Sequence, residues 1–279
     1  MLTTFYPPYH FGGDAVYVQQ LSNALAERGH EVHVAHCRDA YDITGRPPRK
    51  TPPSNPAVRI HTLHGPGTWP SPLRTQQTGR LGFKRTAVRR ILADNDFDVV
   101  HFHNISLVGG LEAMGMAPRA VKLLTLHDYW LICPTHVMFR YGESACTKRD
   151  CLRCQLVHGR PPQFWRLAGS IRRATRHLDR VLSGSRFAID LHREHGLDLP
   201  SDVLPLFNEP VTADATPAGL DGRPFFLFVG RLVKLKGLQF VMDYFRSRPG
   251  VDFLVAGDGE FEGELRTQAA GAPNVHLNG

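Results

Sequence analysis

The chain of 279 residues lacks the features that would export it or insert it into a membrane. Its start has neither the basic segment nor the long apolar segment of a secretory signal, because Pro7 and Pro8 soon interrupt it. Its longest apolar runs, such as Phe225–Val229, are far shorter than the roughly 20 residues that cross a bilayer. We therefore expect a cytoplasmic protein.

Repeats and low-complexity tracts are absent too, and a content of 42% hydrophobic and 21% charged residues is typical of globular proteins. The formal charge is +7, but no recognition motif accompanies it, so we expect no nucleic acid partner. Basic residues concentrate in Lys84–Arg90 and Arg166–Arg180. The second stretch predicts one helix, because apolar residues recur at helical spacing at Phe164, Leu167, Ile171 and Leu178. Its arginines form either a solvated face or a patch for anionic lipid at a membrane surface.

Short apolar or β-branched runs alternate with helical patterns over the first two-thirds of the chain, which predicts an α/β fold with a parallel sheet. The clearest helix runs from Asp14 to Arg28, with Asp14 as its N-cap. The predicted strands are Leu2–Tyr6, Glu31–Cys37, Val58–Leu63, Asp98–His103, Val121–His127 and Arg180–Ser183.

A composition shift after Pro205 predicts a linker at 206–224, which contains three prolines. A second βαβ pattern follows, with strands at Phe225–Val229, Asp252–Ala256 and Asn274–Leu277 and helices at Gly237–Arg246 and Glu260–Ala270. We predict a first Rossmann-like domain at 1–205 and a second at 225–279. A doubly wound domain needs about five or six strands, so we expect the second domain to be incomplete at its C-terminus.

Glycine-rich loops follow several predicted strands. Gly12 and Gly13 precede a helix whose N-terminal N–H groups and dipole suit a phosphate, although an ordinary tight turn explains them equally well. Gly257 and Gly259 lie between a strand and a helix, and either a ligand or a simple connection accounts for them. The loop at Gly12 is not G-x-G-x-x-G, which disfavours a dinucleotide cofactor.

Charged and polar side chains lie beside these loops. Arg231 and Lys236, which follow Gly230, could hold a diphosphate or be two exposed residues in a turn. His127 ends a strand, at the edge where α/β sheets bind ligands, and is either a sugar-binding group or a satisfied half-buried histidine. His101 and His103 also end a strand, and we interpret them as structural or secondary.

Together these motifs resemble family-four glycosyltransferases over nearly the whole chain. The most specific segments are Phe228–Gly237 and Val255–Gly259, taken with the N-terminal glycine pair and His127-Asp128. The resemblance implies two Rossmann-like domains of the GT-B type, an acceptor-side domain at 1–205 and a donor-binding domain at 225–279. The same resemblance implies retaining transfer from a nucleoside-diphosphate sugar, without a catalytic metal, in a cleft between them. It also implies that Arg231 and Lys236 contact the donor diphosphate, that Gly13 approaches it, and that His127 lies near the donor sugar.

The family's paired glutamates, which contact the donor, do not occur in this sequence, so we expect a truncated chain of uncertain activity. The acceptor that we expect is a polysaccharide or lipid-linked glycan. A sugar-nucleotide epimerase or phosphorylase with the same architecture is an alternative enzyme. A non-catalytic binding protein stapled by zinc is the alternative outside enzymes.

Four cysteines cluster after His127 with the spacing C-x12-C-x4-C-x2-C: Cys133, Cys146, Cys151 and Cys154. In a reducing compartment such a cluster binds a metal more readily than it forms disulfides, and four thiolates suit tetrahedral zinc. The sequence therefore predicts an insertion at 133–154 that holds either a structural zinc ion or free thiols that could form a redox disulfide.

Overall fold

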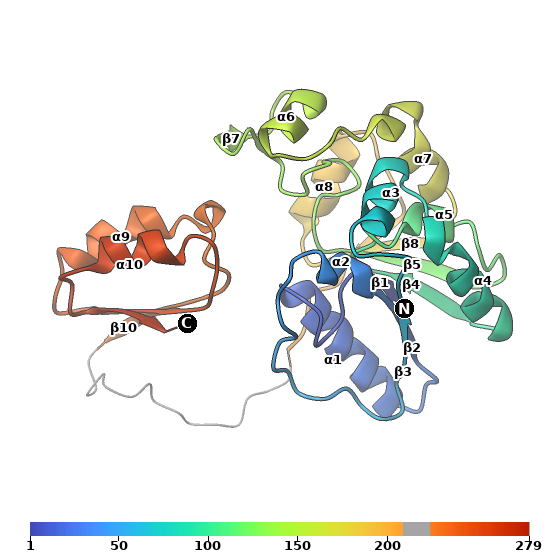
Figure 1. Cartoon of the computed structure of the whole chain (residues 1–279), viewed down its shortest axis with the longest axis horizontal. Coiled ribbons are helices and arrows are strands. Elements are labelled where there is room, and N and C mark those ends of the chain that lie inside the picture. Colours follow the sequence, from blue (N-terminus) through green and yellow to red (C-terminus); the bar gives the residue numbers. More distant parts are fainter. Residues whose placement is uncertain (209–223, 279) are drawn as a thin grey trace. The chain divides into compact units, whose positions relative to one another are not determined.

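The computed structural model describes residues 1–208 and 224–278, which form two compact units that divide near residue 209. Both units consist of a parallel sheet and helices, so the predicted α/β class is confirmed (Figure 1). Most of the predicted linker, residues 209–223, lies outside the described residues. The assignment of an acceptor-side domain at 1–205 and a donor-binding domain at 225–279 stays a prediction.

Unit 1 has a sheet of seven parallel strands in the order β3-β2-β1-β4-β5-β8-β9. Its strand order reverses between β1 and β4, and such a switch point is where open α/β sheets bind ligands. The first strand is shorter than predicted, and β9 is not among the predicted strands because it carries no apolar run. The strands are β1 (Leu2–Thr3), β2 (His33–Cys37), β3 (Arg59–Leu63), β4 (Val99–Phe102), β5 (Val121–Leu126), β8 (Arg180–Ser183) and β9 (Ser201–Val203).

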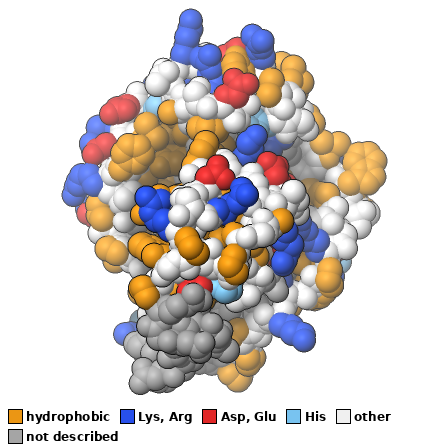
Figure 2. Space-filling model, turned by 90° about the vertical axis from the view of Figure 1, so that its left-hand side faces the viewer, with side chains coloured by type: hydrophobic (Ala, Val, Ile, Leu, Met, Phe, Trp, Pro, Cys, Tyr) orange, Lys and Arg blue, Asp and Glu red, His pale blue; other side chains and the backbone are white. Residues whose placement is uncertain are grey.

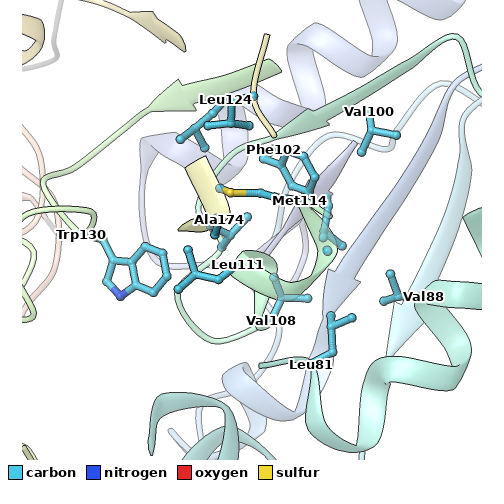
Figure 3. Packing of buried hydrophobic residues seen from close by; sticks show 14 of the residues in the cluster. Leu81, Val88, Val100, Phe102, Val108, Leu111, Met114, Leu124, Trp130 and Ala174 are labelled. Atoms are coloured by element: carbon cyan, nitrogen blue, oxygen red, sulfur yellow. The ribbon is translucent and has the colours of Figure 1, made fainter. Parts of the chain in front are cut away.

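Helices cover both faces of this sheet, since adjacent residues of β2 belong to different cores. Val34 packs in a cluster with Val18 of α1, whereas Ala35 belongs to the cluster that contains Phe102 and Met114. Figure 3 shows the cluster that contains Ala35, in which Val100, Phe102 and Leu124 of the sheet pack with Met114 from the turn that follows residue 113. The helices of unit 1 are α1 (Gly13–Glu27), α2 (Arg38–Asp42), α3 (Pro70–Thr78), α4 (Arg85–Asp94), α5 (Gly110–Ala113), α6 (Cys151–Val157), α7 (Ser170–Thr175) and α8 (Arg186–Glu194), with 3₁₀ turns η1 (Gly82–Lys84) and η2 (Phe164–Ala168).

The N-cap predicted for α1 is wrong. Gly12 is the N-cap residue, and Asp14 lies inside the first helical turn without capping it. The carboxylate of Asp14 instead accepts a hydrogen bond from the Asn104 amide at 3.1 Å. The local pattern predicts that Asp14 caps the helix, but its side chain is instead hydrogen-bonded to Asn104 from the loop after β4.

The single helix predicted over 164–178 is also wrong. Gly169 adopts a left-handed conformation with φ of 68° and separates η2 from α7. Phe164 and Leu167 are consequently 62% and 73% exposed instead of facing the core. The guanidinium of Arg166, expected on a solvated face, stacks over Trp130 at 5.0 Å.

Unit 2 follows the predicted βαβ pattern. Its described strands form a three-stranded parallel sheet in the order β10-β11-β12. The Phe245 ring of α9 stacks on the Phe253 ring of β11 with centroids 4.2 Å apart, which joins helix and sheet. The elements are β10 (Phe225–Val229), 3₁₀ turn η3 (Lys234–Lys236), α9 (Leu238–Arg246), β11 (Asp252–Ala256), α10 (Glu262–Ala269) and β12 (Val275–Asn278), and the short pair β6 (Phe139–Arg140) and β7 (Ser144–Ala145) belongs to unit 1.

Candidate active site

The carboxyl edge of the unit 1 sheet gathers the polar residues that follow β1, β4 and β5. Gly12 and Gly13 begin α1 after the loop from β1, Asn104 follows β4, and His127 and Asp128 follow β5. A small cavity at this edge is lined by His103, Asn104, His127 and Asp128, among others. The topology thus brings the predicted residue His127 to the switch point of the sheet.

Three histidines form a row across β4 and β5. The rings of His101 and His103 lie 4.1 Å apart, and His103 Nδ1 is 3.1 Å from His127 Nε2. His101 Nε2 is 2.8 Å from Thr125 Oγ1. The ring of Tyr17 from α1 meets that of His127 edge-on at 5.6 Å. His127 is therefore held by the two groups that flank it, one from β4 and one from α1.

Burial keeps these imidazoles neutral. It lowers the pKa of His101 to about 3 and that of His103 well below its usual value, because an apolar environment disfavours the charged ring. Burial also lowers the pKa of His127, although the carboxylates of Asp14 and Asp128 oppose this shift. Neutral His127 offers one N–H donor and one lone pair, which suits a sugar hydroxyl better than an anion.

Asp128 is tied to the loop that follows it. Its Oδ2 lies 2.7 Å from His136 Nδ1, and its Oδ1 accepts the Trp130 backbone N–H at 2.8 Å. Burial by itself would raise the pKa of Asp128, but the hydrogen bond and charge of His136 lower it overall. His136 itself has a left-handed backbone, with φ of 74°, which is rare outside glycine. Asp128 is therefore a carboxylate that fixes the turn behind His127.

No steric contact within unit 1 requires a glycine at position 13. It is exposed, and a Cβ atom added there would meet nothing within 4 Å. At Gly12 an added Cβ would lie 3.2 Å from Asp14 Oδ1, which is tight. The backbone at the start of the 15-residue helix α1 is consequently open to solvent, which leaves its N–H groups accessible to an anion.

The basic turn of unit 2 follows β10. Arg231 and Lys236 are both exposed, and neither has an ion-pair or hydrogen-bond partner for its side chain among the described residues. Lys236 ends the turn η3, and Gly237 follows with a left-handed φ of 76° before α9 begins. Two cations therefore stand without counter-charges beside the start of a helix, an arrangement that can bind a diphosphate.

Close backbone contacts require glycine at two positions of unit 2, and the sequence alone does not reveal these contacts. A Cβ at Gly257 would lie 2.0 Å from the Gly230 carbonyl oxygen, and one at Gly259 would lie 2.1 Å from that of Leu232. The two βα loops pack through their backbones, as the bond from Leu232 N to the Asp258 carbonyl at 2.8 Å shows. Close packing explains Gly257 and Gly259 without a ligand, and a donor-binding role for Gly230, Gly257 and Gly259 stays a prediction.

The zinc site predicted at the four clustered cysteines has no support in the described part of the chain. All five are free thiols, and within residues 1–208 and 224–278 no group of three or more His, Cys, Asp or Glu side chains is placed to hold a metal ion. Local partners engage three of the four: Cys133 Sγ lies 3.2 Å from Thr135 Oγ1, Cys154 Sγ accepts the Tyr141 N–H, and Cys146 Sγ donates to the Lys148 carbonyl. Burial raises the pKa of Cys146 and of Cys151, which favours the thiol. The zinc alternative is therefore unsupported.

Sequence reasoning missed the second layer of this site. His103, interpreted as structural or secondary, contacts His127 directly, and Asn104 binds Asp14. The available signal was that His-x-His and His127 end consecutive strands, because the carboxyl ends of neighbouring parallel strands meet at one edge.

The fold and this edge define a Rossmann-like architecture, and comparison with known proteins identifies the family. The sequence pattern of Glycosyltransferase Family 4 matches residues 11–206, most of the chain. The chain therefore belongs to glycosyltransferase family 4. Among curated proteins it is similar to an "Uncharacterized 42.6 kDa protein in cps region" of Klebsiella pneumoniae, with 24% identity over all of this chain and 73% of the relative.

Two solved structures share the fold. Alr3699/HepE of Anabaena, solved in complex with UDP and glucose, is 15% identical with a TM-score of 0.59, and the match covers 99% of this chain and 67% of HepE. WaaG, a glycosyltransferase involved in lipopolysaccharide biosynthesis, is 16% identical with a TM-score of 0.60 over 99% of this chain and 69% of WaaG. These matches support the GT-B fold. Of the helices in the described part of the chain, none is both long and apolar enough to cross a bilayer.

Proposed function

We propose that this glycosyltransferase moves a hexose-type sugar from a nucleoside-diphosphate sugar to a polysaccharide or lipid-linked acceptor, with retention of configuration. The observation that carries the proposal is the pair of unpartnered cations, Arg231 and Lys236, at the βα turn of unit 2. Transfer leaves negative charge on the departing diphosphate, so fixed cations at that point stabilise the transition state. No metal cofactor is part of the proposal.

Two features of unit 1 support a sugar-nucleotide donor. The accessible start of α1 at Gly13 would let backbone N–H groups approach phosphate oxygens. His127, neutral and flanked by Tyr17 and His103, would hydrogen-bond the donor sugar. The leaving phosphate would help to deprotonate the acceptor, so a protein nucleophile is not required for retention.

Surface composition supports the proposed acceptor and location. Residues 144–178 contain eight Lys or Arg but one Asp or Glu, and Leu156, Phe164 and Leu167 in this stretch are more than half exposed. On the face shown in Figure 2, basic and hydrophobic side chains also neighbour each other, with acidic side chains among them. The excess of basic over acidic residues in 144–178, together with its exposed hydrophobic side chains, favours an anionic membrane surface. We accordingly propose action on the inner face of the membrane, where a lipid-linked acceptor would be available, in keeping with the involvement of WaaG in lipopolysaccharide biosynthesis.

Calorimetric titration with UDP and GDP tests the donor site. We expect one of these to bind, and an Arg231→Ala plus Lys236→Ala variant to lose at least about 100-fold in affinity, because charge-assisted contacts are worth roughly 1.5–3 kcal/mol each. Lys234→Ala is the matched control, since Lys234 is exposed in the same turn and should leave affinity nearly unchanged. Equal losses in both variants would show nonspecific charge attraction. Absence of binding by the folded chain would contradict the donor assignment.

The stereochemistry needs its own measurement. Once an acceptor glycan is glycosylated in the presence of the bound donor, the proton NMR spectrum of the product gives the configuration of its new anomeric centre. The same configuration as in the donor sugar supports retention, and the opposite one would contradict it.

A further inference from the structure

His103 is the most buried ionisable side chain of the candidate site, and only one of its nitrogens has a partner. The residue is 3% exposed. Its Nδ1 lies 3.1 Å from His127 Nε2, whereas its Nε2 is buried and has no hydrogen-bond partner among the described residues. A buried polar atom without a partner is uncommon. In this pair of rings it bears on which nitrogen of each histidine carries the proton.

The hydrogen bond between the two rings needs one N–H and one lone pair, and each neutral ring carries a single proton. If His127 donates through Nε2, the proton of His103 must sit on its Nε2, where a buried N–H finds no acceptor. If His103 donates through Nδ1, its buried Nε2 is a bare lone pair instead. Orphaned buried N–H groups are rarer than under-used acceptors, so the second arrangement is favoured.

The second nitrogen of the His127 ring is the one left for a ligand. When Nε2 of His127 accepts from His103, the proton of His127 sits on Nδ1, and this atom has no hydrogen-bond partner among the described residues. This arrangement therefore presents an N–H donor, and not a lone pair, to a ligand.

We propose that His103 is a positioning residue that fixes His127 as the Nδ1–H tautomer, so that His127 donates a hydrogen bond to an oxygen of the donor sugar. This inference rests on the proposed donor site for the identity of the ligand, although the tautomer itself does not depend on it. A fixed donor would make the enzyme select sugars with a hydroxyl oxygen at that point. It would reject analogues that lack the oxygen, because the N–H would then stay unpaired.

Long-range proton–nitrogen NMR of the full chain with labelled histidine tests the tautomer without any ligand. We expect the His127 signals of a ring protonated at Nδ1. In His103→Phe, which cannot donate, the proton should redistribute toward Nε2. In His103→Asn the amide N–H can replace the Nδ1 donor, so the signals of the original protein should return. A wild-type His127 protonated at Nε2 would overturn the proposal, and this spectrum decides even where a variant fails to fold.

A second measurement follows selectivity. UDP-glucose and its single-deoxy analogues are titrated into the wild type and both variants, with UDP alone as the reference. We expect one analogue to bind the wild type at least tenfold more weakly than UDP-glucose, this preference to vanish in His103→Phe, and to persist in His103→Asn, while UDP binds all three alike. A preference that survives in His103→Phe would contradict the role of His103. If UDP does not bind, GDP and the matching GDP-sugar analogues replace the uridine series, and lack of binding of both UDP and GDP by the wild type would contradict the proposed function and leave the tautomer result standing.

Discussion

The carboxyl edges of the two sheets are held together in different ways. In unit 1, side-chain interactions connect the loops. Lys84 Nζ donates to the hydroxyls of Ser71 and Thr75 and lies 3.6 Å from Asp39 Oδ2, and all four side chains are buried. In unit 2, the backbones of the βα loops meet directly at Gly257 and Gly259. A glycine in a βα loop therefore has no single meaning, because Gly13 is sterically free whereas Gly259 is enclosed.

The difference also decides which groups are left for chemistry. The polar side chains of unit 1 largely bind one another, which leaves few unsatisfied atoms such as His127 Nδ1. The backbone contacts of unit 2 consume no charged side chain, so Arg231 and Lys236 have no partner among the described residues. Substitutions can disrupt the side-chain contacts of unit 1 and the backbone contacts of unit 2 separately. The tryptophans Trp69, Trp130 and Trp165 all lie in unit 1, so their fluorescence reports that unit alone.

The largest effect is expected from Lys84→Met. Removing the cation leaves the Asp39 carboxylate buried without its counter-charge, which costs about 3–5 kcal/mol of the free energy of unfolding. Urea unfolding followed by tryptophan fluorescence measures the loss. Arg85→Met is the control, because Arg85 is 58% exposed in its ion pair with Glu112 and should cost at most about 1 kcal/mol. Similar losses in both variants would contradict the role of the buried pair.

Mild acid should weaken unit 1 next most. Burial lowers the pKa of His36 to about 4 and that of His101 to about 3, so below the unfolded value of about 6.5 the unfolded chain binds more protons than the folded one. The contribution of the neutral histidines to the free energy of unfolding is fully present above that pH, and it falls by roughly 2 kcal/mol for each histidine between pH 6.5 and 5. Urea unfolding of unit 1 at several pH values gives the slope, and His36→Gln should reduce it by about one proton.

One outcome would contradict the role of His36. If His36→Gln destabilises unit 1 equally at pH 7 and pH 5, His36 does not take up a proton on unfolding, and its burial does not cause the loss of stability in acid.

Gly259→Ala should destabilise unit 2 by about 1–3 kcal/mol or more. The new Cβ would meet the Leu232 carbonyl at 2.1 Å, and overpacking forces the backbone to shift. Hydrogen exchange of the amides of Leu232 and Phe261, which bond across these loops, measures the effect. Gly263→Ala is the matched control in α10, with open space around it, and should be neutral or stabilising. Unchanged exchange in Gly259→Ala would show that the loops are not held by this contact.

The smallest effect on stability is expected from Gly13→Ala. Its Cβ would meet nothing, so the free energy of unfolding should change by less than about 0.5 kcal/mol. If the start of α1 approaches a donor phosphate, the same change should weaken UDP binding. A stability loss comparable to that of Gly259→Ala would contradict the distinction between the two glycines.

Hydrophobic periodicity and turn residues predicted most elements of the fold, since they act within a few residues. All five predicted elements of unit 2 lie within a few residues of their predicted bounds, and α1 ends at Glu27, one residue before its predicted end. The prediction of one helix over 164–178 was wrong, because apolar spacing carries no information on the left-handed turn at Gly169. The strand β9 stayed unpredicted because its residues are exposed or half-buried and pair only through their backbone.

The sequence by itself determined the α/β class, the family and the position of His127 at a strand end, because each depends on local pattern or on motif order. The tertiary structure decided which neighbours those residues meet. It placed His103 against His127, Asn104 against Asp14 and Lys84 against Asp39. It also enclosed Gly257 and Gly259 while leaving Gly13 open. The physical reason is that burial, pKa and steric fit belong to contacts between residues far apart in the chain.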